Sequence, residues 1–327
     1  MNKPGRRHHY VSQFYLRGFT DTGNEDGLLW VHSHDKAEPR RDIPANVCFR
    51  TDYQRIDIPG IPPDIFDKTL GGTVEANASK VLNSIIRRQA LPATSGGLLK
   101  LMRFVALLSV QNPSVREGFG GGDSRMAEMR LRLVAENAPA RFASEVDDLV
   151  ADGFIVPDDL TVEKALAEDF GDNGIGVMQR RHMRNLLSLL ESFPLEMLMR
   201  RTWQLLVARR EPEDFICTEH PVVLVPHKPQ RSLLDEPGFG TAEQVVVPLC
   251  SRLAMVGSFE PSARPLANVT TETVAHVNSL LINHAHRFLF TAKPQFAWRM
   301  PDGSIGGAAD LRECSAKIRR GREVGQS

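Results

Sequence analysis

The spacing of apolar residues changes twice along the chain and divides it into three regions. In the first region, residues 27–33 (GLLWVHS) have the content of a strand, and residues 53–58 predict a second strand near it. A short helix is expected over residues 12–19, with Ser12 as its N-cap. Proline and glycine at 59–63 then interrupt the pattern, so the first region ends there.

In the second region, from about residue 64 to residue 200, apolar positions recur with the helical period of 3.6 residues. Residues 95–111 are apolar nearly all round, which predicts a central buried helix that stops before Pro113. The glycine-rich residues 118–123 favour a flexible hinge, because they follow a helix and lack the Lys-Ser/Thr of a phosphate-binding loop. Further helices are predicted at 71–88, 123–143, 161–169 and about 176–200.

The third region, from residue 201, consists of short β-branched runs separated by Pro, Gly and Asp, which is typical of antiparallel strands. These runs are 202–209, 214–218, 222–227, 243–250 and 253–259, followed by a helix at 271–285 and a strand at 287–292. Strands therefore flank a long helical middle. We expect one α+β domain over residues 1–310, with an antiparallel or mixed sheet of N- and C-terminal strands and the helices on one side of it. Residues 311–327 are expected to be a partly disordered basic tail.

Composition changes this picture little. Hydrophobic residues make up 42% of the chain and charged residues 24%, which is ordinary for a globular protein with a sizeable core. No apolar run is long enough to span a bilayer, and none follows the basic N-terminus as a secretory signal requires. We therefore expect a cytoplasmic protein without membrane association, in which the four scattered cysteines are free thiols.

The net charge is zero, but the charges are segregated. Acidic residues concentrate at 145–172, and basic residues at 3–17, 179–184 and 317–322. The balanced total argues against broad non-specific binding to nucleic acid, while the local patches could meet a phosphate-bearing ligand. The alternative is that these are solvated surface charges.

The stretch RRHHYVSQFYLRGF (6–19) is the first candidate site. Neighbouring residues of an extended segment point to opposite sides, so His8 and His9 are not expected to bind one metal ion together. Arg6, Arg7, a histidine and the N-terminus of the following helix would suit a phosphate or a carboxylate. In the alternative, the aromatic residues anchor the N-terminus in the core and the histidines are ordinary polar neighbours.

The stretch DFICTEHPVVLV (214–225) is the second candidate site. Glu219 and His220 follow an apolar strand, and Pro221 keeps His220 out of the helical conformation. A carboxylate and an imidazole in a rigid turn can coordinate a metal or transfer protons. In the alternative, this is an ordinary polar connection between strands, with Glu219 bonded to local backbone.

HHYVSQFYLRGF resembles the opening of an uncharacterised bacterial family of unknown function, whose members begin His-His-Tyr-Val-Pro-Gln-Phe-Tyr-Leu-Arg-x-Phe. A later Phe-Ile-Thr-Ser-Asp-x-Pro-Val segment of that family is similar to FICTEHPV (215–222), preceded by Trp203. The resemblance also covers VEANASKVL, a helix ending near Gln111 and Arg116, and NSLLINHAHRFLF, and so spans most of the chain. Ser12 and Glu219 stand where the family has proline and aspartate. The family implies no activity.

The first functional hypothesis is a metal-dependent hydrolase of phosphodiester bonds, similar to a nuclease. A divalent metal ion is its candidate cofactor, with His9 and Glu219 as ligands. The proposed catalytic residues are His8, His9, Glu75, Glu219 and His220. The proposed substrate-binding residues are Arg6, Arg7, Tyr10, Gln13, Gln111 and Arg116.

The second hypothesis is a non-catalytic binding or regulatory protein, whose N-terminal stretch is a structural anchor. Its partner surface would be the acidic segment 145–172 or the basic segment 179–201. A third is a metal-free acid–base enzyme that uses His8 or His9 with Glu219. Nucleic acid or another phosphate-bearing molecule is the candidate partner in the first hypothesis.

Overall fold

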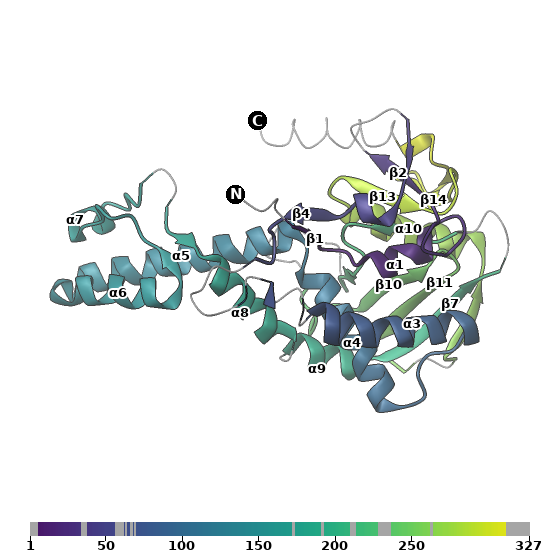
Figure 1. The fold of residues 1–327 in the computed structure, drawn as a ribbon, viewed down its shortest axis with the longest axis horizontal. Coiled ribbons are helices and arrows are strands. Elements are labelled where there is room, and N and C mark those ends of the chain that lie inside the picture. Colours follow the sequence, from purple (N-terminus) through teal and green to yellow (C-terminus); the bar gives the residue numbers. More distant parts are fainter. Residues whose placement is uncertain are drawn as a thin grey trace.

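The structure is a computed structural model (Figure 1). It describes residues 6–33, 38–55, 62, 64, 65, 68, 70–171, 174–190, 193–209, 214–227, 237–261 and 264–311. Residues 312–327 of the expected basic tail lie outside these, whereas Leu311 is buried. No helix in the described part of the chain has both the length and the apolar character needed to cross a membrane.

The largest sheet has five strands in the order β12-β7-β11-β10-β9. Strand β12 runs parallel to β7, and the other neighbours are antiparallel. In chain order the strands are β7 (Thr202–Ala208), β9 (Val223–Val225), β10 (Gln244–Cys250), β11 (Leu253–Ser258) and β12 (Leu266–Val269). All five come from the region after residue 201, where the pattern of short β-branched runs predicted most of this sheet.

The second sheet, with the order β3-β2-β13-β8, joins strands from both ends of the chain. Its strands are β2 (Leu29–Ser33), β3 (Arg40–Asp42), β8 (Cys217–Thr218) and β13 (Phe288–Thr291). The α+β class and the pairing of N- with C-terminal strands are therefore confirmed, although the strands form several sheets instead of one. The described residues also form three two-stranded sheets: β1 (Arg7–His9) with β4 (Phe49–Thr51), β5 (Phe154–Ile155) with β6 (Gly176–Val177), and β14 (Trp298–Arg299) with β15 (Ile305–Gly306).

Helices cover both faces of the five-stranded sheet, which corrects the expectation of helices on one side. Side chains alternate along β7, so Leu205 and Val207 enter one core and Leu206 enters the other. The first core contains residues of α3 (Ala76–Arg88) and α4 (Ser95–Val110), and the second contains residues of α10 (Thr271–His284). Helix α4 carries eight buried side chains, as its nearly continuous apolar sequence predicted.

The N-terminal stretch packs against β10. Helix α1 (Gln13–Leu16) continues into a 3-10 turn (Arg17–Phe19), and Tyr15, Leu16 and Phe19 are fully buried. The Tyr15 hydroxyl donates a hydrogen bond to the carbonyl oxygen of Pro248. Gly18 lies so close to β10 that an added Cβ would stand 2.9 Å from Cys250 Cβ. The aromatic residues therefore anchor this stretch in the core, as the second hypothesis requires.

The middle of the chain forms an arm that projects from the two sheets (Figure 1). Its elements are α5 (Pro113–Asn137), a 3-10 turn (Pro139–Arg141), α6 (Phe142–Asp152), α7 (Val162–Leu166) and α8 (Gln179–Leu190), followed by α9 (Phe193–Met199). The predicted hinge at 118–123 is wrong, because α5 runs through these residues without interruption. The predicted helix at 176–200 is two helices.

The arm has a small hydrophobic core of its own, separate from the two cores of the sheets. It contains Ala127, Leu131, Ala135, Phe142, Leu149, Phe154, Ala165, Phe170 and Ile175. Most of these residues come from α5, α6 and α7, and both α6 and α7 pack against α5. Packing within this core stabilises the shape of the arm.

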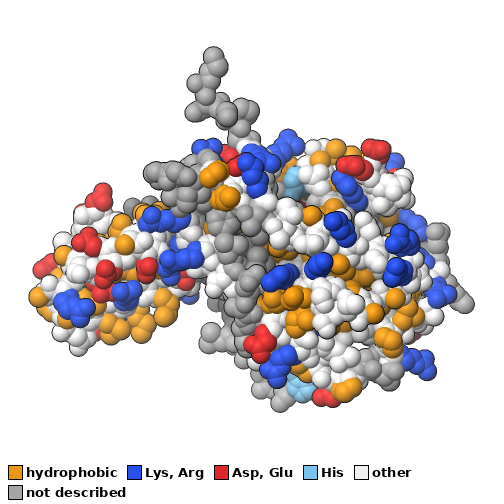
Figure 2. All heavy atoms as spheres, turned by 60° about the horizontal axis from the view of Figure 1, so that its bottom comes forward, with side chains coloured by type: hydrophobic (Ala, Val, Ile, Leu, Met, Phe, Trp, Pro, Cys, Tyr) orange, Lys and Arg blue, Asp and Glu red, His pale blue; other side chains and the backbone are white. Residues whose placement is uncertain are grey.

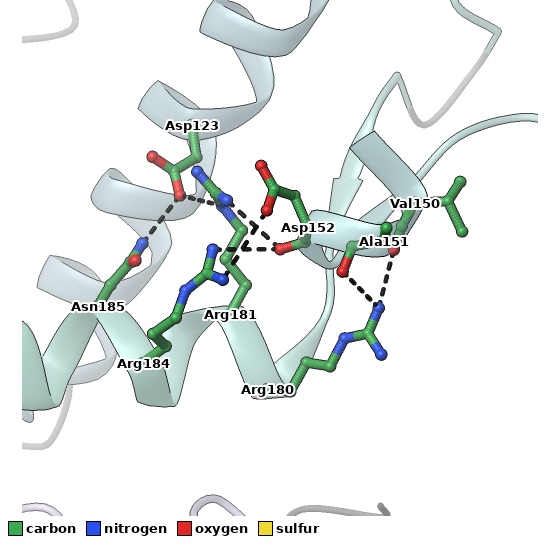
Figure 3. A network of polar contacts seen from close by, with 8 residues as sticks. All are labelled: Asp123, Val150, Ala151, Asp152, Arg180, Arg181, Arg184 and Asn185. Atoms are coloured by element: carbon green, nitrogen blue, oxygen red, sulfur yellow. Dashed lines mark hydrogen bonds and ion pairs between the residues drawn. The ribbon is translucent and has the colours of Figure 1, made fainter. Parts of the chain in front are cut away.

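Arginines of α8 close the C-terminal end of α6 (Figure 3). Arg180 donates to the carbonyl oxygen of Val150 at 2.8 Å, and Arg184 donates to that of Asp152 at 3.3 Å. Positive charge is favourable at the C-terminal end of a helix, where carbonyl groups lack helical partners. Part of the basic segment 179–184 thus bonds to backbone carbonyl groups in the acidic segment, although Arg180 and Arg184 remain exposed.

Two further short elements are seen in the described residues before α3. A 3-10 turn (Pro44–Asn46) lies between β3 and β4, and a π-helical turn (Leu70–Glu75) leads into α3. The strand predicted at 53–58 is not present over residues 53–55, which form a turn, and residues 56–58 lie outside the described residues. The strand of this region is β4, a few residues earlier, and it pairs with β1 instead of β2.

Candidate functional site

Strand β1 separates the N-terminal side chains onto two sides, as predicted from its extended conformation. His8 is 2% exposed, and its Nδ1 accepts a hydrogen bond of 2.8 Å from the backbone N–H of Gln54. Tyr10 follows on the same side, where its ring lies 6.5 Å from that of Tyr53. His9 lies on the other side, 5.8 Å from the ring of Phe49.

Both ring nitrogens of His9 have partners. Its Nε2 donates to the carbonyl oxygen of Ala45 at 3.2 Å, and its Nδ1 accepts from the side-chain amide of Gln13 at 3.3 Å. Gln13 therefore orients His9 within the chain. A metal ligand needs a ring nitrogen with an open lone pair, so this arrangement does not support His9 as a partner of Glu219 in a metal site.

The groups predicted to bind an anion at the start of α1 bond to other residues of the chain instead. Ser12 has the extended backbone of an N-cap, but its hydroxyl donates to Glu75 Oε1 and does not cap the helix. Helix α1 is only four residues long. Arg6 pairs with Asp64 at 3.3 Å, and Arg7 donates to Asn46 at 3.3 Å. Glu75 and the two arginines are thus engaged in contacts that hold the N-terminal stretch.

Glu219 connects three segments that are far apart in the sequence. It follows β8 and is 5% exposed. Its Oε1 accepts hydrogen bonds from the backbone N–H groups of Arg287 and Phe288, the latter at 3.1 Å. Its carbonyl oxygen accepts from Asn112 Nδ2 at 2.6 Å, beyond the end of α4. Burial raises the pKa of the Glu219 carboxyl, and the two N–H groups oppose this shift.

His220 lies beside two histidines that the sequence did not single out. Its backbone N–H donates to Thr218 Oγ1 at 3.0 Å, which fixes the turn. Burial lowers the pKa of His220 to about 4, and the positive charges of His286 and His284 act in the same direction. Both of these histidines are exposed, at the end of α10 and in the loop to β13.

The two candidate stretches, 6–19 and 214–225, come together where Glu219 acts on Tyr10. Burial raises the pKa of the Tyr10 hydroxyl, and the neighbouring Cys48 and Glu219 raise it further. Arg50 on β4 is close enough to oppose the shift. Cys48 has a φ of 54°, a left-handed conformation that costs a residue other than glycine about 1–2 kcal/mol. Such strained positions are often found at functional sites.

Gln111, at the C-terminal end of α4, has an unusual environment. It is 1% exposed, and within the described part of the chain neither Oε1 nor Nε2 of its side chain has a hydrogen-bond partner. Its carbonyl oxygen accepts from the Tyr53 hydroxyl at 3.0 Å, which places it beside the tyrosines of the N-terminal segment. We call the group of Tyr10, Tyr53, Gln111, Asn112 and Glu219 the polar cluster.

Several residues around the polar cluster escaped the sequence analysis. These are Cys48, Arg50, Tyr53, Asn112, His284, His286 and Arg287. The spacing in NHAHRF was visible in the sequence, but nothing there showed that it would stand beside His220. Arg116 lies in α5, and its side chain is outside the described residues.

Among the residues that the structure describes, no three His, Cys, Asp or Glu side chains come together in a group that could hold a metal ion. Three of the cysteines, Cys48, Cys217 and Cys250, are buried free thiols, as expected. Burial raises the pKa of each of these thiols, which makes them poor nucleophiles.

A family model described as "Protein of unknown function (DUF4238)" matches residues 7–295. No curated protein and no solved structure gives a significant match. The matched range begins within β1 and ends after β13, and so contains both motifs and the whole polar cluster. The chain therefore belongs to the DUF4238 family, whose function is unknown.

Proposed function

We propose that the protein binds a small phosphate-bearing ligand at the polar cluster and acts as a non-catalytic binding or regulatory protein. The observation that carries the proposal is the buried side-chain amide of Gln111, which has no hydrogen-bond partner among the described residues. A buried polar group without a partner costs about 1–3 kcal/mol. A ligand that forms hydrogen bonds with this amide would remove that cost. Ligand binding would thus explain why a polar side chain is buried at this position.

Two arginines near the polar cluster would attract an anion, most strongly when the Glu219 carboxyl is protonated. Arg50 acts on Tyr10 from β4, and Arg287 follows the loop that Glu219 holds. The Gln111 side-chain N–H can donate a hydrogen bond to a phosphate oxygen, and arginine binds phosphate with paired hydrogen bonds. This agrees with the phosphate-bearing partner expected from the basic N-terminal residues. It requires no metal ion.

Ligand binding can be tested with Gln111→Met, which keeps the length of the side chain and removes both polar atoms. The probes are inorganic phosphate and AMP, with thermal unfolding and calorimetric titration as readouts. We expect a probe to raise the melting temperature of the wild type, because a ligand that binds only the folded state stabilises it. Gln111→Met should lose this response, and without a probe it should be at least as stable as the wild type.

The matched control is Gln89→Met, since Gln89 is exposed at the end of α3. It should respond to the probes like the wild type. The proposal fails if neither probe stabilises the wild type, or if Gln111→Met keeps the full response. Marked destabilisation of Gln111→Met without a probe would show that the amide has partners within the protein.

A second candidate is a metal-free phosphodiester hydrolase, favoured by the histidines that Glu219 and the α10–β13 loop bring together. His220 would take a proton from water while the water oxygen bonds to phosphorus. The ester P–O bond would break, and protonated His286 would give its proton to the departing oxygen. The metal-dependent form would instead require His9 to release Ala45 or Gln13.

The hydrolase is tested with bis(p-nitrophenyl) phosphate in the presence of EDTA. Turnover that falls in both His220→Gln and His286→Gln, while the fold is kept, would support it. Turnover that appears only after manganese or magnesium is added would point to the metal-dependent form. If the wild type gives no turnover under either condition, both forms are excluded for this substrate.

A further inference from the structure

A cavity of about 260 Å³ lies at the second sheet, beside the paired strands β2 and β13 (Figure 1). Its walls come from three parts of the chain: β2 with the residues just before β3, the loop after β13, and the segment that ends at Leu311. None of its lining residues belongs to the polar cluster. The cavity is therefore a second candidate site, separate from the one proposed above.

Part of the cavity lining is apolar and rigid. Trp30 on β2 is half-buried, and Pro39 and Pro294 line the cavity from two different loops. The indole side chain has only two rotatable bonds, and the proline rings have almost no side-chain freedom. These flat side chains lose little conformational entropy when a ligand covers them.

His32 is the most buried polar residue of the lining, at 6% exposure. The Thr291 hydroxyl donates to the carbonyl oxygen of Lys293 at 2.6 Å, so its hydrogen is already used. His32 Nε2 lies 3.0 Å from the same hydroxyl oxygen and must therefore donate to it, which makes Nδ1 the acceptor of the neutral ring. Phe296 also holds the ring, with the two centroids 5.2 Å apart. The imidazole is thus fixed in one orientation and one tautomer.

The cavity does not suit an anion. Figure 2 shows lysine and arginine side chains scattered over the larger body of the molecule, yet none of the described residues that line the cavity is a lysine or an arginine. The lining instead includes the carboxylate of Glu38. Phosphate and carboxylate ligands are bound mainly by arginine and lysine, so this cavity differs from the polar cluster in the class of ligand that it favours.

An organic cation is not favoured either. The guanidinium carbon of Arg41 lies 5.7 Å from the centre of the Trp30 ring, and Arg41 is ion-paired with Asp21. The attraction of this ring for a positive charge is therefore already used within the chain. Glu38 is exposed, so water and salt screen its charge. A cationic ligand would gain neither a vacant aromatic face nor a buried carboxylate.

Uncharged groups that both donate and accept make up the rest of the polar lining. Ser33 has a hydroxyl and Gln295 has an amide, whereas the Glu38 carboxylate only accepts. A wholly apolar ligand would displace water from these groups without replacing its hydrogen bonds. The lining therefore favours an uncharged ligand that has an apolar face and several polar groups.

We propose that the cavity binds an uncharged monosaccharide. The C–H groups on one face of a sugar ring would pack against Trp30 and the prolines, which removes apolar surface from water. Each sugar hydroxyl donates and accepts, so the hydroxyls would pair with Ser33, Glu38 and Gln295. Sites for drug-sized ligands have volumes of about 300–1,000 Å³, so this smaller cavity suits one sugar ring better than an oligosaccharide.

The test uses the full chain and saturation-transfer NMR, followed by calorimetric titration of each probe that binds. The sugar probes are glucose, galactose, mannose and xylose, and the comparison probes are choline and adenine. We expect at least one sugar to bind about tenfold more tightly than choline and adenine. Adenine is included because a nucleobase is also flat and carries donors and acceptors.

Two variants locate the sugar in the cavity. Ala309 is an exposed lining residue, so Ala309→Phe should fill part of the cavity without disturbing a core and weaken sugar binding by about tenfold or more. Gln295→Met keeps the length of the side chain and removes its polar atoms. It should weaken binding by about three- to tenfold, the value of one or two neutral hydrogen bonds.

The matched controls are Ala140→Phe and Gln89→Met, since both residues are exposed and lie outside the cavity. Both should bind the sugar like the wild type. Gln111→Met should also bind it normally, and Ala309→Phe should keep the response to phosphate. Failure of this proposal and failure of the phosphate proposal are therefore distinguishable.

Three results would overturn the monosaccharide proposal. The first is the absence of binding by all four sugars. The second is binding of choline or adenine at least as tight as that of the best sugar and sensitive to Ala309→Phe, which would assign the cavity to a different class of ligand. The third is an unchanged sugar affinity in both Ala309→Phe and Gln295→Met, which would place the sugar elsewhere.

Discussion

The side-chain Oε1 of Glu219 lies 3.1 Å from the backbone nitrogen of Phe288, which joins the turn after β8 to the first residue of β13. The carboxyl is almost fully buried, and its second bonded N–H belongs to Arg287. Burying a carboxylate usually costs free energy, yet this one accepts hydrogen bonds from two backbone N–H groups. Glu219, which was expected to bind a metal, thus holds the start of β13 against the turn after β8.

The first prediction concerns Glu219→Gln. Because burial raises the pKa of Glu219 above 4.5, the stabilising contribution of this group is complete below that pH and is lost as the pH rises through the folded-state pKa. Glutamine keeps an oxygen for the backbone donors and carries no charge. Urea unfolding should therefore show the variant gaining stability relative to the wild type from pH 4 to pH 8. A difference that stays constant over this range would contradict the burial argument.

The second prediction has the opposite sign and concerns His220. Its pKa falls from 6.5 to about 4 on folding, so its contribution is present above pH 6.5 and is lost as the pH falls towards 4. We expect His220→Gln to lose less stability than the wild type between pH 6.5 and pH 4. An NMR titration of the His220 ring in the folded protein checks the cause directly. A midpoint near 6.5 would contradict it.

The third prediction tests the N-terminal anchor. Tyr15→Phe removes only the hydroxyl and leaves the buried carbonyl oxygen of Pro248 without this donor. The free energy of unfolding should fall by about 1–3 kcal/mol, measured by urea denaturation. Phosphate and AMP should still stabilise the variant by the same increment, because the anchor is separate from the polar cluster. A loss below about 0.5 kcal/mol would show that the anchor depends on apolar packing alone.

The fourth prediction concerns the arm. Arg181→Met keeps an aliphatic chain against Phe154, whose ring lies 4.1 Å from the guanidinium carbon, and removes the bond to Asp123. Hydrogen exchange should become faster in α5, α6 and α8, because the free energy of local opening should fall by about 1–3 kcal/mol. Exchange in the five-stranded sheet should stay unchanged. Uniform acceleration over the whole chain would mean that the arm does not open by itself.

The control for that experiment is Arg184→Met. The Arg184 side chain is 58% exposed, and its closest carboxylate oxygen, in Asp152, is 3.9 Å away. Exposed ion pairs contribute little, so the effect on exchange should be below about 0.5 kcal/mol. A loss as large as that of Arg181→Met would assign the bracing to net charge instead of to the bonds made by Arg181.

Local patterns predicted the fold better than they predicted the site. The period of the apolar residues found α3, α4 and α10, and the β-branched runs found β7, β10 and β11, because each of these elements buries one face or both. Strand β12 was missed. It contains the polar Asn268 and pairs in parallel with β7, so neither alternation nor a hairpin turn marks it. The glycines at 118–123 were misread because glycine lowers helix propensity without forbidding a helix.

The site was harder to predict because its groups meet only after folding. Alternation along an extended segment correctly separated His8 from His9, which depends on local geometry alone. His9 bonds to Ala45 and Gln13, and Ser12 bonds to Glu75. Of these partners, local geometry could indicate only Gln13, which lies four residues after His9. Gln111 was chosen by resemblance, and its buried amide became evident only from packing.

The pairing of β2 with β13 has a consequence for how the protein is made. Residues 29–33 lie beside residues 288–291, so the edge of β2 that pairs with β13 stays unpaired until residues 288–291 have left the ribosome. At about 5–20 residues per second this takes roughly 13–50 s. During that time Leu29 and Val31, both buried in the folded protein, have no β13 beside them. Truncation after the five-stranded sheet would leave that edge permanently open, and chaperone binding to the nascent N-terminus would protect it.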